Sequence, residues 1–463
     1  MAGSVTTSPR HNANRVPDRP LHRDRETPTP PRVGHTYERE MDMTTATHPV
    51  PDRVVVIGAG MLGLSTAWFL QEHGVQVTVL DRTGVAAGSS WGNAGWLTPG
   101  VATPLPEPAV LRYGLRAALS PSSPVYVPPS VKPAMLRFLT GFVRHSTMTA
   151  WKTAMQHLVP LNDLSLDSFD QLKRGGVAAD TRDAVSFLAA YRTEAERKTL
   201  LEEIEHIHAA GQDVEFEALT GDQARTIEPH LSHEIGAAIL LRGQRFIDPG
   251  RYIHALAESV SDRGGKIIDS ATVSRLQDVG SGIVITTAEG SVEQFDVAVI
   301  ATGAWLGELA RPFGVRNVVQ AGRGYSFSVA IDQVPESPLY FPAQRVACTP
   351  IGDRLRIAGM MEFRRPEAPL DHRRVQAIAD AARPLLHGID IANRQDEWVG
   401  SRPCTVDGLP LIGATTSDRV YVAGGHGMWG ITHGPVTGRL LAQTMVTGRL
   451  PEHLKPFDPL RRS

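Results

Sequence analysis

Short apolar runs alternate with amphipathic segments along this chain from residue 53 onward. The longest apolar stretch, 54–70, is interrupted by three glycines, which argues against a membrane span. We predict instead a strand over 53–58, a glycine turn with a helix to about residue 73, and a second strand over 74–81.

The same periodicities predict the elements of the remaining chain. Helices are expected over 107–119, 131–145, 150–173, 194–211, 249–265 and 429–447. Strands are expected over 184–192, 266–273, 282–288, 295–301, 325–330, 345–350, 353–359 and 418–425. This order predicts an α/β fold: a Rossmann-like nucleotide-binding domain interrupted by a second, α+β domain with a mainly antiparallel sheet.

Residues 1–52 differ from the rest, because they hold eight prolines, scattered charges and almost no apolar periodicity. Such a segment cannot bury enough apolar surface to fold, so we predict a disordered tail. It has no apolar core of a signal peptide, and Met41 or Met43 fits as an alternative start.

Charge and cysteine content exclude several classes of protein. The 47 Lys and Arg nearly balance the 49 Asp and Glu, so no nucleic-acid-binding surface is indicated. Two cysteines, Cys348 and Cys404, exclude a disulfide scaffold and a four-cysteine zinc site. The 17 histidines show no metal-ligand spacing, so we expect no metal. These features predict a cytoplasmic protein.

A glycine motif lies between the first predicted strand and helix. Gly58, Gly60 and Gly63 fit the G-x-G-x-x-G pattern of a dinucleotide site, in which a tight turn brings the backbone to a pyrophosphate at a helix N-terminus. Asp81 ends the second strand, where a carboxylate can accept from ribose hydroxyls. The motif alone does not distinguish NAD from FAD.

Five segments together resemble one family: VVVIGAGMLGLSTAWFL, SSWGNAGWLTPG, VAVIATGAW, WVGSRPCTVDGLPLIG and AGGHGMWGITHGPVTGRLLA. They resemble the FAD-dependent D-amino-acid oxidase superfamily, in particular its bacterial D-amino-acid dehydrogenase branch, with glycine oxidase and hydroxyproline dehydrogenase relatives. The resemblance covers about 53–455. It implies an FAD-binding domain formed by 53–105, 230–310 and 395–455, and a substrate domain formed by 106–229 and 311–394.

The resemblance also implies which residues hold non-covalent FAD. Val273 would meet adenine through its backbone, unless it is an ordinary strand valine, and the helix after Trp429 would point at the flavin N1–C2=O edge. The cofactor-binding candidates are Gly58, Gly60, Met61, Leu62, Gly63, Asp81, Arg82, Gly88, Ser89, Ser90, Asn93, Ala94, Gly95, Val273, Thr302, Gly303, Gly425, His426, Gly427, Met428, Trp429 and Gly430.

Three residues are candidates for the catalytic site. Arg402 matches the position where glycine oxidases hold the substrate carboxylate, with an interdomain salt bridge as the alternative. Tyr325 could offer a hydroxyl from the antiparallel sheet or simply pack within it, and we expect His426 to bond the flavin or to pack rather than to act as a base. Glycine oxidases have a second Arg near the last helix, where this chain has Met428 and Trp429.

The implied reaction is oxidative deamination of a D-amino acid by hydride transfer from Cα to flavin N5, with electrons passed to a quinone or another respiratory carrier. A D-proline or hydroxy-D-proline dehydrogenase and a glycine- or sarcosine-type oxidase stay open as alternatives. So does a flavin-bearing subunit that needs a partner chain. The expected partners are the amino acid, the electron acceptor and a peripheral contact with the inner membrane.

Overall fold

The computed structural model describes residues 50–109, 111, 124–127 and 132–462. Most of the predicted tail (1–52) and most of the predicted helix over 107–119 lie outside the described residues. Every element below belongs to one compact unit, His48–Ser463.

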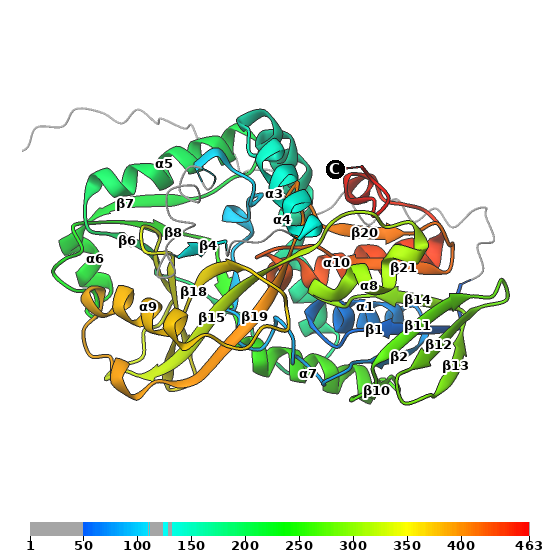
Figure 1. Ribbon diagram of the computed structural model, residues 1–463. Helices are drawn as coiled ribbons and strands as arrows, with labels where there is room; N and C mark the ends of the chain where they lie inside the picture. Colours follow the sequence, from blue (N-terminus) through cyan, green and yellow to red (C-terminus); the bar gives the residue numbers. More distant parts are fainter. Residues whose placement is uncertain (1–49, 110, 112–123, 128–131, 463) are drawn as a thin grey trace, which may run out of the picture. The chain divides into compact units, whose positions relative to one another are not determined.

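A six-stranded sheet carries the nucleotide-binding topology, in the order β10–β2–β1–β14–β21–β20 (Figure 1). All neighbours are parallel except β20 and β21, which are antiparallel. Its strands are near-continuous apolar runs, as expected for a sheet buried on both faces: helices cover one face, and a three-stranded sheet (residues 273–295) with a short helix (306–310) covers the other. They span β1 (Arg53–Ile57), β2 (Gln76–Leu80), β10 (Lys266–Ile268), β14 (Val297–Ile300), β20 (Leu411–Ala414) and β21 (Val420–Gly424).

Four helices pack around the core cluster that includes one face of this sheet: α1 (Met61–Glu72), α4 (Met148–Arg174), α7 (Pro249–Asp262) and α10 (Gly430–Thr447). Glycines allow α1 and α10 to approach closely, because a Cβ at Gly438 would lie 2.6 Å from the backbone of Ser65 and Thr66. This contact fixes the N-termini of both helices near the same end of the sheet.

A nine-stranded sheet follows the order β19–β15–β18–β17–β16–β6–β8–β7, with β4 paired to β18. Most of its pairs are antiparallel. α9 (His372–Ala382) packs against β15 and β18 (Figure 1), and α5 (Glu194–Ala209) packs against β6 and β8. The strands are β4 (Val125–Tyr126), β6 (Phe187–Tyr191), β7 (Phe216–Thr220), β8 (Ala237–Leu241), β15 (Gln320–Ala330), β16 (Leu339–Phe341), β17 (Val346–Ile351), β18 (Arg354–Phe363) and β19 (Gln395–Cys404).

Smaller elements complete the unit. Two three-stranded sheets have the orders β11–β12–β13 and β3–β9–β5. Their strands are β3 (Trp96–Leu97), β5 (Arg182–Asp183), β9 (Arg245–Phe246), β11 (Val273–Asp278), β12 (Ile283–Thr287) and β13 (Val292–Phe295). The remaining α-helices of the described residues are α3 (Pro133–His145), α6 (Gly221–Ile227) and α8 (Leu306–Ala310).

The predicted α/β fold, with a Rossmann-like parallel sheet and a mainly antiparallel second sheet, is confirmed. The single strand expected over 266–273 is wrong: β10 ends at Ile268, and Val273 begins β11 in another sheet. β8 and β19 belong to the nine-stranded sheet, although their residues lie in the ranges assigned to the FAD-binding domain. The domain boundaries stay predictions. Among the described residues no helix combines the length and apolar character needed to cross a bilayer.

Candidate functional site

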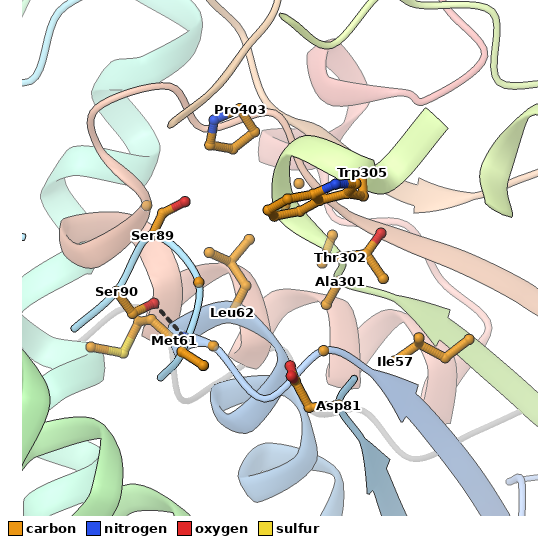
Figure 2. Close-up of a pocket in the computed structure, with 18 of the residues that line it drawn as sticks. Ile57, Met61, Leu62, Asp81, Ser89, Ser90, Ala301, Thr302, Trp305 and Pro403 are labelled. Atoms are coloured by element: carbon orange, nitrogen blue, oxygen red, sulfur yellow. Dashed lines mark hydrogen bonds between the residues drawn. The ribbon is translucent and has the colours of Figure 1, made fainter. Parts of the chain in front are cut away.

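One pocket lies at the carboxyl ends of β1, β14 and β21, where open α/β sheets bind their ligands. Segments distant in sequence meet there: the turn after β1, the segment after β2, the turn after β14, the end of β19 and the start of α10. In the view of Figure 2, Pro403 and Trp305 lie on the opposite side of the pocket from Asp81.

The turn after β1 depends on two glycines. Gly58 has φ +116°, and a Cβ there would lie 2.5 Å from the carbonyl oxygen of Ala301, the first residue after the neighbouring strand β14. A Cβ at Gly63 would lie 1.9 Å from the carbonyl oxygen of Gly58. Gly63 therefore permits helix–strand packing and does not itself line the pocket, whereas Gly58 and Gly60 do.

The N-terminus of α1 opens onto the pocket without a capping side chain. Gly60 is its N-cap residue, its first turn contains no acidic residue, and the Met61 amide has a long contact of 3.4 Å with the Ser90 hydroxyl (Figure 2). Unsatisfied amides and the positive end of the helix dipole make this a favourable position for an anionic group such as a diphosphate.

Asp81 connects two backbone segments at the edge of the pocket through hydrogen bonds. One carboxylate oxygen accepts the Ala59 amide at 2.9 Å, and the other accepts the Thr83 and Gly84 amides at 2.8 and 2.9 Å. The side chain is half-buried and lines the pocket, so it has remaining acceptor capacity toward a ligand.

The turn after β14 presents an unsatisfied hydroxyl. Thr302 lines the pocket, and its Oγ1 is buried without a hydrogen-bond partner among the described residues. Next to it, the Trp305 indole donates to Glu367 and the Arg82 guanidinium lies 3.7 Å from a Trp305 ring centroid. A buried hydroxyl costs free energy unless it is bonded, so Thr302 indicates a polar ligand here.

α10 brings a second helix N-terminus to the pocket, again with no capping side chain. Gly427 has φ +54°, and its amide donates to the Pro403 carbonyl at 2.9 Å, which joins the end of β19 to this helix. Trp429 is the residue directly before α10, and its indole donates to the Thr103 carbonyl at 2.7 Å. This bond fixes the start of the helix.

His426 lies between β21 and α10 and is buried. Its Nε2 lies 2.9 Å from the Thr437 hydroxyl, and its Nδ1 has no partner among the described residues. Burial, with a smaller contribution from His433, holds the pKa of His426 well below its usual value, so the imidazole is neutral. Burial likewise lowers the pKa of His433 to about 3; its Nε2 lies 2.7 Å from Oδ1 of Asn162.

Arg402 reaches the pocket from β19 and forms no ion pair with a described carboxylate. Its guanidinium lies over Gly324 of β15, where an added Cβ would be 2.3 to 2.4 Å from the guanidinium atoms. It donates to the Met360 carbonyl at 2.8 Å and lies 3.9 Å from the Met361 sulfur. Burial lowers its pKa, yet an Arg side chain stays charged, so the pocket holds an uncompensated cation.

A β-bulge aims the Met360 carbonyl at Arg402. The register of β15 and β18 shifts between Arg323 and Tyr325, and Met360 has φ +69°, which is unfavourable for a residue with a side chain. We infer that this strained backbone positions the guanidinium.

Tyr325 lies apart from the pocket. Side chains of a strand alternate between faces, and Tyr325 is on the face of β15 opposite to Gly322 and Gly324. Its hydroxyl donates to Glu362 at 2.6 Å within a buried cluster that includes Arg323. Burial and this bond raise the pKa of Tyr325 above its usual range. A contact with a ligand in the pocket is therefore not supported.

Most of the predicted residues do meet at this pocket. Those that line it are Gly58, Gly60, Met61, Leu62, Asp81, Arg82, Gly88, Ser89, Ser90, Asn93, Val273, Thr302, Gly303, Arg402, His426, Gly427, Met428 and Gly430. The predicted residues outside its lining are Gly63, Ala94, Gly95, Gly425, Trp429 and Tyr325.

Sequence reasoning missed a set of lining residues: Ile57, Leu80, Thr83, Ala87, Ala271, Thr272, Ala301, Trp305, Glu308, Leu309, Pro403, Ala423, Gly424 and Ile431. Several of them directly adjoin predicted residues at strand ends, and this adjacency is the signal by which the sequence could have identified them. Cys404 is buried outside the lining, and burial raises the pKa of its thiol to about 12. The described residues contain no metal-binding group of three or more His, Cys, Asp or Glu.

Comparisons with known proteins identify the family of this chain and proteins that share its fold. The DAO family profile, described as FAD dependent oxidoreductase, matches residues 53–444. A D-amino acid dehydrogenase of Cereibacter sphaeroides is 31% identical over 86% of this chain and 93% of its own length, and one from Vibrio vulnificus is 27% identical over 88% and 99%. Glycine oxidase from Geobacillus kaustophilus shares the fold with a TM-score of 0.67, at 22% identity over 89% of this chain and all of that one.

Proposed function

This chain belongs to the DAO family of FAD-dependent oxidoreductases, and from that premise we propose that it oxidatively deaminates a D-amino acid to a 2-oxo acid. Electrons would pass on to a quinone or another carrier. The observation that carries this proposal is Arg402: a partly buried cation that forms no ion pair with a described carboxylate, at the pocket where the cofactor would bind.

The pocket residues fit FAD. Two buried polar atoms of the lining, Thr302 Oγ1 and His426 Nδ1, have no partner among the described residues, which a large polar cofactor would explain. We assign the glycine turn at Gly58 and the N-terminus of α1 to its diphosphate and Asp81 to a ribose hydroxyl. The buried, protonated thiol of Cys404 supports non-covalent binding.

Arg402 would bind the substrate carboxylate. A guanidinium forms bidentate bonds with a carboxylate, and one of its nitrogens is already held by the Met360 carbonyl. The lower polarity around a partly buried guanidinium strengthens such a bond. The substrate would thus be fixed by its carboxylate, leaving Cα free to be oriented.

When bound, FAD supplies the acceptor for a hydride from the substrate Cα. The substrate ammonium first gives a proton to solvent, and the nitrogen lone pair then forms the C=N bond as the hydride leaves Cα. Water would hydrolyse the resulting iminium to a 2-oxo acid and ammonium. The N-terminus of α10 would stabilise negative charge that develops beside it. Neutral His426 lacks the charge to do so and would serve as a hydrogen-bonding group.

The curated relatives named D-amino acid dehydrogenase support the D-amino-acid substrate, and glycine oxidases support the amine chemistry alone. D-proline, hydroxy-D-proline, glycine and sarcosine are the alternatives that share a carboxylate next to an amine. Each of them would use Arg402 in the same way.

The test is anaerobic loss of flavin absorbance in the purified chain, with D-amino acids, their L-enantiomers, D-proline, hydroxyprolines, glycine and sarcosine. We expect bleaching by D-amino acids and none by L-enantiomers. Bleaching by sarcosine or glycine alone would replace the proposed substrate class. A flavin-loaded chain that no compound reduces, but that becomes active with a partner chain, would favour the subunit alternative.

A further inference from the structure

One face of the nine-stranded sheet carries buried polar side chains. Phe327 of β15 and Ile357 of β18 pack in an apolar core on one face. Because side chains alternate between the faces of a strand, Ser326 and Arg356 lie on the other face. Ser326 is fully buried and Arg356 is 5% exposed. Buried polar groups cost free energy unless they are hydrogen-bonded, so the partners of these two side chains indicate what this face does.

The partners are three consecutive backbone carbonyls in the segment between β2 and β3. Nη1 of Arg356 donates to the Trp91 carbonyl at 2.8 Å and has a longer contact of 3.5 Å with the Asn93 carbonyl. The guanidinium also lies 4.9 Å from a Trp91 ring centroid. The Ser326 hydroxyl donates to the carbonyl between them, that of Gly92, at 2.9 Å. The sheet therefore binds the oxygen side of these three peptide groups.

The opposite side of the same peptide groups has free donors. In a trans peptide the N–H points away from the preceding C=O, so the amides of Gly92, Asn93 and Ala94 are directed away from the sheet. The Asn93 amide donates to the Ser90 carbonyl at 3.3 Å. The amides of Gly92 and Ala94 have no hydrogen-bond partner among the described residues. Since Ser90 and Asn93 line the pocket, these two donors lie beside the site assigned to FAD.

Arg356 is the charged member of this contact. It forms no ion pair with a carboxylate of the described residues; Asp248 and Asp396 raise its pKa, and burial lowers that pKa more strongly. An Arg side chain stays charged, and its hydrogen bonds are stronger than those between neutral groups. A Cβ at Gly92 would lie 2.1 Å from the Trp398 ring of β19, so the close approach of the segment to the sheet requires glycine at this position. A charged donor and tight packing thus anchor this segment.

We propose that Arg356 and Ser326 are positioning residues for FAD: they hold the carbonyls of residues 91–93 against the sheet, so that the amides of Gly92 and Ala94 donate to the bound cofactor. Donors that are fixed in advance need no reorganisation and favour the negative charge that FAD gains on reduction. An arginine that only stabilises the fold would leave the free amides on the far side of the segment unexplained. This role depends on FAD binding and not on the identity of the substrate.

The experiment measures the affinity of the apoprotein for FAD by titration, and the two-electron potential of bound FAD by equilibration with a reference dye without oxygen. Arg356→Met keeps the length of the side chain and its packing on Trp91 but lacks the donor. We expect it to bind oxidised FAD about tenfold more weakly and reduced FAD about 100-fold more weakly. The additional factor of about ten corresponds to a potential lowered by about 30 mV. Arg356→Lys, which keeps the charge and loses the planar fork, should lie between the two. Ser326→Ala should weaken FAD binding about fivefold, the effect of one neutral hydrogen bond, and lower the potential in the same direction.

Arg197→Met is the matched control, because the Arg197 side chain is 16% exposed and donates to the Leu219 carbonyl at 2.8 Å, outside the pocket lining. It should lower the melting temperature and leave FAD affinity and potential unchanged. Ser326→Ala removes no charge, so a lower potential in that variant reports the position of the amides and not the field of a cation. If Arg356→Met does not fold, Arg356→Lys and Ser326→Ala decide. An unchanged potential in the variants that fold would overturn the proposal, whatever their melting temperatures. The expected potentials in a chain that oxidises no amino acid would support it and contradict the proposed function.

Discussion

Gly324→Ala tests whether the backbone of β15 positions Arg402. The added Cβ would lie 2.3 to 2.4 Å from the guanidinium atoms of Arg402, whereas ordinary contact begins near 3.4 Å. The guanidinium must therefore move by about 1 Å, which also weakens its 2.8 Å bond to the Met360 carbonyl. Because the clash is with the end of a flexible side chain, we expect the fold to tolerate it.

The magnitude follows from the contact that would be lost. A hydrogen bond to a charged group contributes about 1.5–3 kcal/mol, and a misplacement of about 1 Å in a site can cost about 100-fold in rate. We expect kcat/KM for a D-amino acid to fall about 10- to 100-fold, mainly through KM. The free energy of unfolding should change by less than about 1 kcal/mol, since Ala restricts the unfolded chain more than Gly does.

Steady-state kinetics with a D-amino acid and with the amine that lacks its carboxylate would measure the effect, and thermal unfolding would report the fold. In an Arg402→Ala background, Gly324→Ala should add little, because the two changes act on one contact. An unchanged kcat/KM in the single variant would refute the reasoning. So would an equal loss for the substrate without a carboxylate.

Three further predictions follow from the buried contacts. Gly60→Ala should lower FAD affinity at least tenfold in a titration while the apoprotein still folds, because Gly60 lines the pocket. Gly63→Ala should instead lower the melting temperature, because its Cβ would lie 1.9 Å from the carbonyl oxygen of Gly58. Tyr325→Phe should destabilise the chain by about 1.5–3 kcal/mol in urea unfolding, through loss of the bond to Glu362, and leave kcat/KM nearly unchanged. Stability should fall as the pH drops below about 6.5, because His433 and His426 are neutral in the fold and protonated when unfolded. Each histidine contributes up to about tenfold in the folding constant per pH unit, so replacing His433 by Gln should reduce this slope by about half in a pH series of urea denaturation, and the His426 part should remain.

The sequence predicted the nucleotide-binding part in detail because its determinants are local. The turn at Gly58 requires a positive φ, and the packing at Gly63 excludes any side chain, so both requirements are visible as glycines at fixed spacing. The strands and helices around them follow from apolar runs and periodicity. The segments after residues 81, 301 and 424 were assigned to the site through the resemblance of their motifs to the family, and in the structure these strand ends meet at one edge of the parallel sheet.

Only the tertiary structure decided what the antiparallel sheet contributes. Tyr325 and Gly324 are adjacent in sequence, but strand alternation places Gly324 beneath Arg402 and turns Tyr325 to a buried glutamate on the other face. The bulge at Met360 arises from pairing between β15 and β18, which no local pattern specifies. The unpaired state of Arg402 likewise depends on which carboxylates the fold keeps away from it, a property of long-range packing that a linear sequence does not contain.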